Sequence, residues 1–166
     1  MTASQVLAAT PQAAPSRYAL VLTTDPDAVG AAQRLRHRVF ADELGARPTD
    51  EPGVDVDRFD AFCDHLIVRE ERTGEVVGTD RMLPPERARA AGSLYAQREF
   101  VIDELAPLRR SLVETGRSCV HPAHRSGAVG LLWAGIARYM LLTGNEAGAP
   151  AHGGTRRATG PRRAGR

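Results

Sequence analysis

The sequence predicts a single domain of the α/β (α+β) class, in which helices pack against a sheet. Three observations indicate this class. The chain has 166 residues, 42% hydrophobic and 25% charged, which is typical of one globular domain. Short apolar runs bounded by turn residues are typical of strands, and two longer segments have helical character. Strand, helix, hairpin, strand and helix follow one another without an internal repeat.

The first strand and the first helix are expected before residue 45. The run YALVL at 18–22 is apolar and is followed by Thr, Asp and Pro, so it predicts a buried strand. Asp25 or Thr24 is expected to cap the next helix, which the helical spacing of apolar residues predicts over 27–44. Residues 45–62 have no periodicity and predict a long loop.

An antiparallel hairpin is expected next. Segments 65–68 and 75–82 flank a turn that ends in Gly74. Two prolines stop the hairpin and favour a short helix over 84–91.

The last part of the domain is expected to end in a strand and a helix. Residues 100–102 predict a short strand, and 105–109 a helical turn. Residues 112–121 predict a longer strand, ended by a proline. The segment 127–143 is apolar nearly all round, so it predicts a helix that is buried on most sides.

The two ends are expected to lie outside this folded unit of residues 17–143. Residues 1–16, rich in Ala and Pro, predict a mobile leader. Residues 144–166 have five arginines, one acidic residue and no Val, Ile, Leu, Met or aromatic, so they predict a disordered basic tail. The tail carries +4, and since the whole chain carries +2, the other residues sum to −2. We interpret the tail as a solvated end and expect no specific nucleic-acid partner.

Composition excludes several classes of protein. Residues 1–15 lack the features of a secretory signal, and no run of about 18 apolar residues lacks a charge, so no membrane span is expected. Two cysteines, Cys63 and Cys119, do not make a disulfide scaffold, which favours a cytoplasmic protein. The absence of lysine excludes lysine Schiff-base chemistry and a lysine-dependent phosphate loop.

The segment 114–127 holds the residues most typical of a site. A turn with Arg125 opens the last helix, whose free N–H groups suit a phosphate; an ordinary strand–helix connection is the alternative. A regular strand places Glu114 and Arg117 on opposite faces. A bulge at Gly116 restores them to one face, where they suit a substrate amine and carboxylate; an exposed ion pair is the alternative.

Two further groups of polar residues are candidates for binding. Asp57 and Asp60, preceded by Asp55, suit an ammonium group, a metal or a solvated loop. A metal is least favoured, because the spacing of a calcium loop is missing. Arg36 and Phe40 share a face of the first helix, where a surface arginine is the alternative.

Cysteine and zinc chemistry are not favoured by the sequence. Cys119 and His121 share a strand face, yet no third group orients them as a thiol–imidazole pair. His124 adds a third zinc-type ligand without a second pair at finger-like spacing. We therefore expect no metal site.

The ordered set of motifs resembles a known family. The motifs are RHRVF at 36–40, DRFD at 57–60, GTDR at 78–81, ETGRSCVHP at 114–122 and HRSGAVGLLWAGIARYM at 124–140. Over residues 17–143 they are similar to the GNAT-superfamily acyltransferases that make ornithine lipids, often labelled hemolysin-like. More distantly they resemble the acyl-homoserine-lactone synthases.

The resemblance implies a mixed sheet that opens between two central strands around an acyl thioester. It implies transfer of a fatty acyl group from acyl carrier protein, or from acyl-CoA, to the α-amine of ornithine or a similar amino acid. The pantetheine of the donor lies along strand 112–121, the amine attacks directly, and no cofactor is permanently bound. A lipid product further implies peripheral contact with a membrane.

The resemblance also implies roles for individual residues. Glu114 and Arg117 are the expected catalytic pair, with Glu114 helping to remove the amine proton. The other acceptor-site residues are Arg36, Phe40, Asp57, Asp60 and Arg81. The expected donor-binding residues are Val120, Arg125, Gly127 and Gly130. Backbone N–H groups near Val120 are expected to polarise the thioester carbonyl.

Three departures from the family patterns refine these expectations. Lactone synthases usually carry a tryptophan after the first helix, where this chain has Gly45-Ala46, which favours the ornithine-lipid branch. The phosphate turn keeps only part of its pattern, which favours acyl carrier protein over coenzyme A. The family pattern stops at Thr143, so we expect the fold to be incomplete at its C-terminus and activity to be weak or lost. A lactone synthase, an acetyltransferase and a non-catalytic fragment are the alternatives.

Overall fold

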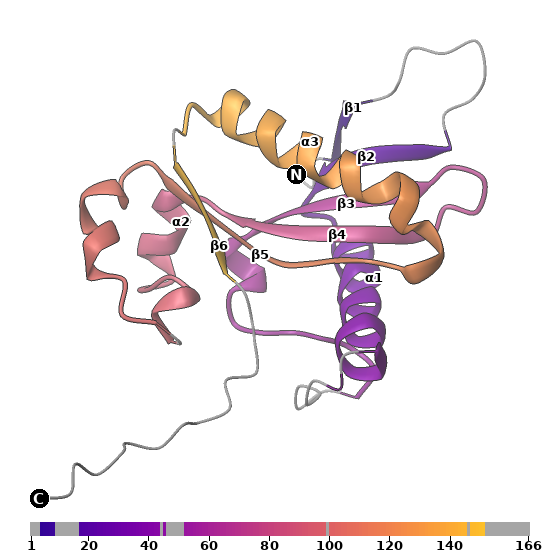
Figure 1. Cartoon of the computed structure of the whole chain (residues 1–166), viewed down its shortest axis with the longest axis horizontal. Coiled ribbons are helices and arrows are strands. Elements are labelled where there is room, and N and C mark those ends of the chain that lie inside the picture. Colours follow the sequence, from indigo (N-terminus) through magenta and orange to yellow (C-terminus); the bar gives the residue numbers. More distant parts are fainter. Residues whose placement is uncertain are drawn as a thin grey trace, which may run out of the picture.

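A six-stranded sheet forms the centre of the protein (Figure 1). The computed structural model describes residues 4–8, 17–43, 45, 52–98, 100–145 and 147–151. The strands are β1 (Ser4–Ala8), β2 (Tyr18–Thr23), β3 (Asp64–Glu70), β4 (Val76–Leu83), β5 (Leu112–Val120) and β6 (Ala147–Ala151). They lie side by side in chain order; β1 to β5 are antiparallel neighbours, and β6 is parallel to β5.

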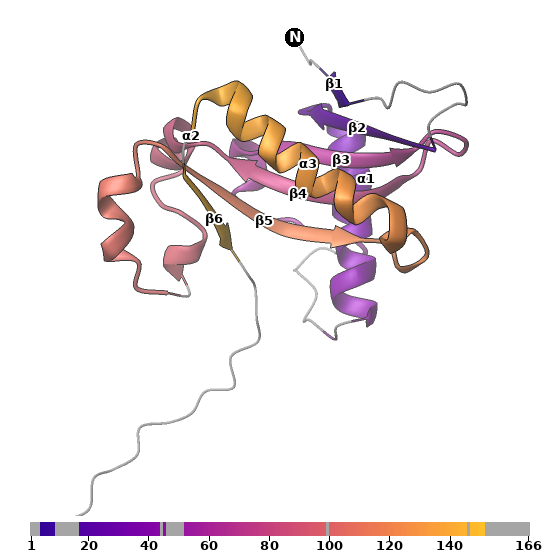
Figure 2. The same cartoon turned by 45° about the horizontal axis from the view of Figure 1, so that its top comes forward.

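Helices cover both faces of this sheet (Figures 1 and 2). Helix α1 (Pro26–His37) lies on one face and α3 (Arg125–Thr143) on the other, while α2 (Pro85–Ala90) lies near the start of β5. Because side chains alternate along a strand, Leu20 packs in the layer under α3 and Val21 in the layer under α1. The core is therefore two apolar layers with the sheet between them.

Most of the predicted elements are confirmed. The carboxylate of Asp25 caps α1 by accepting hydrogen bonds from the N–H groups of Asp27 and Ala28, both at 3.1 Å. The helix continues as a π-helical turn, Arg38–Glu43, close to the predicted end. Short 3-10 turns at Asp103–Leu108 and Pro122–His124 precede β5 and α3.

Four expectations are corrected by the structure. Residues 100–102 form no strand, and Val101 is almost fully exposed. Residues 4–8 of the expected leader form β1, and residues 147–151 of the expected tail form β6. The family pattern that ends at Thr143 predicts no further strand, whereas β6 pairs with the first half of β5. Residues 1–3 and 9–16 of the leader, and residues 146 and 152–166 of the tail, lie outside the described residues.

Helix α3 is less buried than its composition predicts. Leu132 and Tyr139 pack on the sheet, whereas Trp133, Leu141 and Leu142 are exposed. By length and composition alone, the helical stretch Pro122–Thr143 is apolar enough to cross a membrane, although core helices of globular domains pass the same test. Since α3 lies along the sheet, we interpret it as the cover of that face.

Gly135 lies where α3 packs closely on β2 and β3. A Cβ atom there would lie 2.7 Å from Leu66 Cδ2 and 2.9 Å from Leu20 Cδ2. We expect Gly135→Ala to lower the free energy of unfolding by about 1–3 kcal/mol through overpacking. The matched control is Gly130→Ala on the same helix, where a Cβ meets nothing within 4 Å and alanine is expected to gain up to about 1 kcal/mol. Equal midpoints for the two variants in urea would contradict this account of the contact.

Candidate active site

Three arginines and three aspartates form a network between α1, the following loop and β4. Arg36 of α1 is fully buried; its Nε lies 3.0 Å from Asp55 Oδ2 and its Nη2 2.9 Å from Asp60 Oδ1. The loop folds back because the N–H of Asp57 donates to Asp60 Oδ2 at 2.9 Å. The helix and the loop are thus joined by buried ion pairs, in which each charge has a partner of opposite sign.

Two further arginines reach the same carboxylates from the sheet. Arg81 Nη1 on β4 lies 2.7 Å from Asp57 Oδ1 and 3.4 Å from Asp60 Oδ1. Arg117 Nη1 on β5 lies 3.4 Å from Asp55 Oδ1, and its Nη2 lies 3.7 Å from Asp57 Oδ2. The predicted site residues Arg36, Asp57, Asp60, Arg81 and Arg117 are therefore brought together.

The network fixes the charge of its members. Burial raises the pKa of Asp60, but Arg36 and Arg81 outweigh that effect and hold the pKa below its ordinary value. Burial lowers the pKa of His65, whose Nε2 lies 3.2 Å from the carbonyl oxygen of Asp60. At neutral pH this corner of the sheet therefore holds an ionised aspartate and a neutral imidazole.

Glu114 lies on β5, next to this network, in a different environment. It is buried, and its two carboxylate oxygens accept hydrogen bonds from the N–H groups of Tyr95 at 2.7 Å and Ala96 at 2.8 Å. Burial raises the pKa of Glu114 above its ordinary value, although these two N–H groups act in the opposite direction. A fixed carboxylate with increased proton affinity is suited to general base chemistry.

A bulge in β5 places Glu114 and Arg117 on the same side of the sheet. Thr79 pairs with Cys119 and Arg81 with Gly116, so that two residues of β5, Arg117 and Ser118, oppose one residue of β4. The predicted bulge is confirmed, with its extra residue just after Gly116. Arg117 has a positive φ of 55°.

Tyr95 joins the two members of the expected catalytic pair. The Arg117 guanidinium lies 5.4 Å from the centre of the Tyr95 ring, while the N–H of Tyr95 bonds to Glu114. A cavity of about 10 Å³ beside Glu114 is lined by Arg81, Tyr95 and Gly116 among others. Glu114 and Arg117 thus share a face without forming an ion pair with each other.

Asp80 holds the bulge from the opposite strand. It is buried, its Oδ1 accepts a hydrogen bond from the N–H of Gly116 at 3.2 Å, and Ser118 also bonds to its side chain. Burial raises the pKa of Asp80 to about 6 from 3.8, against the effect of these hydrogen bonds. A carboxylate therefore fixes the segment that presents Arg117.

The raised pKa of Asp80 makes stability depend on pH. In the unfolded chain Asp80 loses its proton near pH 3.8, and in the folded chain near pH 6, so the folded state binds more protons between these values. Stability should fall as pH rises through this range, by up to about 3 kcal/mol. We expect Asp80→Asn to be more stable than the wild type at pH 7.5 but not at pH 4, as measured by urea unfolding. An equal difference in unfolding free energy between Asp80→Asn and the wild type at both pH values would contradict the raised pKa of Asp80.

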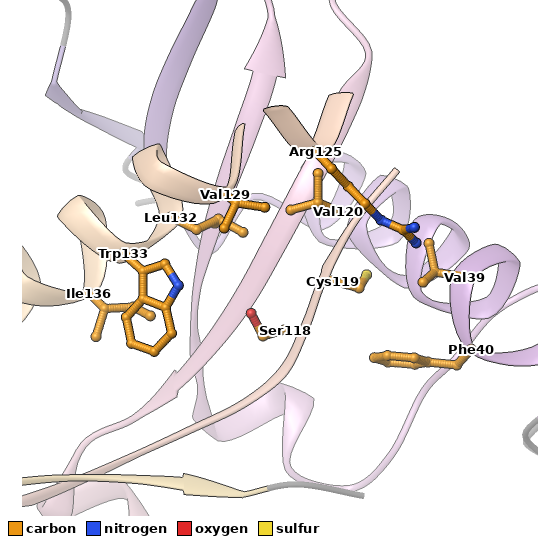
Figure 3. Close-up of a pocket in the computed structure, with 10 residues that line it drawn as sticks. All are labelled: Val39, Phe40, Ser118, Cys119, Val120, Arg125, Val129, Leu132, Trp133 and Ile136. Carbon is orange, nitrogen blue, oxygen red and sulfur yellow. The ribbon is translucent and has the colours of Figure 1, made fainter. Parts of the chain in front are cut away.

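A larger pocket of about 290 Å³ lies along the outer edge of β5 (Figure 3). Trp133 and Ile136 of α3 point toward β5 from one side, and Phe40 of the π-helical turn lies on the other. Its lining residues are Val39, Phe40, Ser118, Cys119, Val120, Arg125, Val129, Leu132, Trp133 and Ile136. Because the resemblance implies an acyl thioester along this strand, we refer to this pocket as the acyl pocket. In the described part of the chain, β6 pairs with β5 only up to Gly116, before this pocket begins.

The expected donor-binding residues divide into two groups. Val120 and Arg125 line the acyl pocket, and Arg125 is tied to Glu43 by a 2.6 Å ion pair. Gly127 and Gly130 do not line it. A Cβ atom at Gly127 would lie 2.7 Å from Tyr18 Cε2, and Gly130 faces open space. Gly127 therefore serves the packing of α3 on β2.

Comparison with known protein families decides the identity of this fold. A family model described as the acetyltransferase (GNAT) domain matches residues 35–134, from the end of α1 to the middle of α3. The chain belongs to the GNAT family. The matched residues include the charged network that begins at Arg36 and the acyl pocket as far as Trp133.

Curated relatives of this GNAT domain are acyltransferases. The chain is 41% identical over 138 residues to an L-ornithine N(alpha)-acyltransferase of Rhodobacter capsulatus, a match that covers 78% of this chain and 53% of the relative. A protein of the same name from Brucella abortus is 42% identical over 123 residues, covering 68% and 44%. The chain thus spans about half the length of the curated relatives it matches.

A solved structure supports the same architecture. A CoA-dependent acyl-homoserine lactone synthase, solved with SAM and isopentyl-CoA, superposes with a TM-score of 0.55 at 27% identity. The match covers 75% of this chain and 58% of that one.

The two cysteines of the GNAT domain are not nucleophiles. Cys63 and Cys119 are both buried, and burial raises the pKa of each thiol to about 12. Both therefore stay protonated at neutral pH. Among the residues that the structure describes, no group of three or more His, Cys, Asp or Glu side chains is placed to hold a metal ion.

Several site residues of the GNAT domain escape the sequence analysis. The sequence places Asp55 beside the acidic pair without a role, whereas the structure ties it to Arg36 and Arg117. Tyr95 follows a Gly-Ser-Leu segment typical of a surface turn, and Asp80 occupies an ordinary strand position. The one available signal is Asp80 itself, a carboxylate inside an apolar strand.

Proposed function

We propose that the protein transfers a fatty acyl group from a thioester to the α-amine of ornithine or a similar amino acid. The observation that carries this proposal is the shared face of Glu114 and Arg117, on the same strand as three lining residues of the acyl pocket, Ser118, Cys119 and Val120. The names of the curated relatives support the acceptor and the reaction class. The related fold of a lactone synthase supports an acyl thioester as donor.

The charge of the site favours an amino acid as acceptor. Arg36, Arg81 and Arg117 face Asp55, Asp57, Asp60 and Glu114, so that acidic groups outnumber basic ones by one when all are charged. That excess attracts an ammonium group. Arg117 has 24% of its side chain exposed, against 1% for Arg36 and 5% for Arg81, so Arg117 is the guanidinium best able to bind an acceptor carboxylate.

The proposed reaction needs one base and no covalent enzyme intermediate. Glu114 accepts a proton from the acceptor ammonium, and the free amine attacks the thioester carbonyl carbon. The C–N bond forms and the C–S bond breaks, so that the amide and a thiol leave the site once the sulfur has taken up a proton. We assign polarisation of the carbonyl to backbone N–H groups of β5 near Val120, beside the acyl pocket.

We assign the donor role to acyl carrier protein in preference to coenzyme A. The ion pair between Arg125 and Glu43 supports this choice, because it occupies the arginine that a nucleotide phosphate requires. The exposed apolar side chains of α3, among them Trp133 and Leu141, support peripheral contact with a membrane that receives the lipid product.

A thioester assay on the purified chain tests the proposed function. Acyl carrier protein and coenzyme A thioesters of the same fatty acid are offered with ornithine, Nα-acetylornithine or SAM, and free thiol and amide product are both measured. We expect thiol release that depends on ornithine and is absent with Nα-acetylornithine. Release with SAM alone would assign the lactone-synthase reaction. No release with any acceptor, from a folded chain, would favour a non-catalytic role.

A further inference from the structure

A second pocket, which we call the α2 pocket, lies between α2 and the start of β5. It encloses about 250 Å³ and shares no lining residue with the acyl pocket. Its apolar wall is made by Pro85, Ala88, Leu94 and Leu112, all of them buried. This wall belongs to the packed cluster behind the catalytic site.

The polar lining of the α2 pocket offers hydrogen-bond donors. Arg89 and Arg109 both line it, and within the described part of the chain neither guanidinium group forms a hydrogen bond or an ion pair. Gln97 uses its Oε1 to accept from the N–H of Leu94 at 2.8 Å, which leaves its amide N–H groups to donate. Ser93 Oγ accepts from Arg58 Nη2 at 2.7 Å and keeps its own proton. None of the described residues that line the pocket carries a carboxylate.

We propose that the α2 pocket binds a small amphiphile with an anionic head, a carboxylate or phosphate, and a short alkyl body. The head is held by Arg89 and Arg109, since guanidinium groups pair with both anions through two parallel hydrogen bonds. The alkyl body covers the apolar wall, and the volume, below the roughly 300 Å³ of usual ligand sites, limits the ligand to a small molecule. The inference is independent of acyl transfer.

The pocket also lies behind the turn that holds Glu114. Leu94 and Gln97 line it, while the residues between them, Tyr95 and Ala96, donate their N–H groups to Glu114. A ligand in this pocket therefore contacts the turn whose backbone N–H groups bind the carboxylate of Glu114.

Amide chemical shifts of the ¹⁵N-labelled full chain test this proposal. The probes are octanoate and octyl phosphate, and the comparison compounds are octanol and inorganic phosphate. We expect saturable shifts at Gly92, Ser93 and Leu94 with at least one probe, and binding weaker by about tenfold or more for either comparison compound, because each lacks the tail or the head. Equal affinity for octanol, or shifts confined to the Trp133 indole in the acyl pocket, would overturn the proposal.

Arginine-to-glutamine variants inside and outside the pocket give a second measurement. The double variant Arg89→Gln/Arg109→Gln is expected to weaken binding of the probe by about tenfold or more. The control is Arg110→Gln, which removes an exposed neighbouring charge outside the pocket and should leave the affinity unchanged. If the control and the double variant bind alike, the pocket does not select an anion, and the proposal fails. Since all three arginines are exposed, the variants are expected to fold.

Discussion

Glu114→Gln is expected to reduce the rate of acyl transfer by about 10²–10⁴, the usual contribution of general base catalysis. The acceptor amine is an ammonium at neutral pH, and the glutamine amide does not accept its proton. The raised pKa of Glu114 brings its proton affinity closer to that of the amine it serves. The loss is therefore expected in kcat, with little change in the KM for the donor.

The pH profile separates this chemical role from a structural one. In Glu114→Gln the rate should rise about tenfold per pH unit, since it depends on the fraction of free amine alone. In the wild type the rate should level off above the pKa of Glu114. Glu104→Gln, an exposed residue of the turn before β5, is the matched control and should keep the wild-type profile. Parallel profiles for Glu114→Gln and the wild type would show that another group takes the proton.

Arg36→Met is expected to lower the free energy of unfolding by about 3–5 kcal/mol, because it leaves buried carboxylates without their partner. Asp55 loses its closest guanidinium, and Asp60 loses Arg36 and keeps Arg81. Methionine preserves the length and helix propensity of the side chain, so that α1 itself is little affected. The loss is large beside the total stability of a small domain, about 5–15 kcal/mol.

Two controls assign the effect of Arg36→Met to the ion pairs. Arg34→Met, which changes an exposed side chain of the same helix, should change the free energy of unfolding by less than about 0.5 kcal/mol. The pKa of Asp60 is lowered in the folded state, so its contribution is present above pH 3.8 and is lost as pH falls through the folded pKa. The difference in unfolding free energy between Arg36→Met and the wild type should therefore become smaller at acidic pH. A difference independent of pH would point to packing alone.

The sequence predicts the inner part of the fold well and its edges poorly. Strands β2 to β5 are apolar runs that any partner would bury, so periodicity and turn residues suffice to find them. Strand β6 has the sequence AGAPA, which lacks strand-forming side chains and is held by its register with β5. Such strands depend on a neighbour that is distant in the sequence.

The site shows the same division between local and distant information. Gly116 between Glu114 and Arg117 predicts a bulge, because glycine in a strand often marks one. The carboxylate that fixes this bulge belongs to Asp80, which lies 36 residues before Gly116 in the sequence. No local sequence pattern predicts that contact. Burial of Arg36, where a surface arginine is the common outcome, likewise follows from carboxylates 19 and 24 residues away, Asp55 and Asp60.

Both cysteine thiols of the protein are shielded by its core, at 3% exposure for Cys63 and 7% for Cys119. A chromogenic disulfide reagent reacts with thiolates, so it should leave the native protein unmodified while it captures each thiol that a donor releases. Turnover can then be followed continuously in a cuvette without a background from the enzyme. A slow rise in colour without substrate would in turn report the reaction of these buried thiols, and so the rate at which the fold opens.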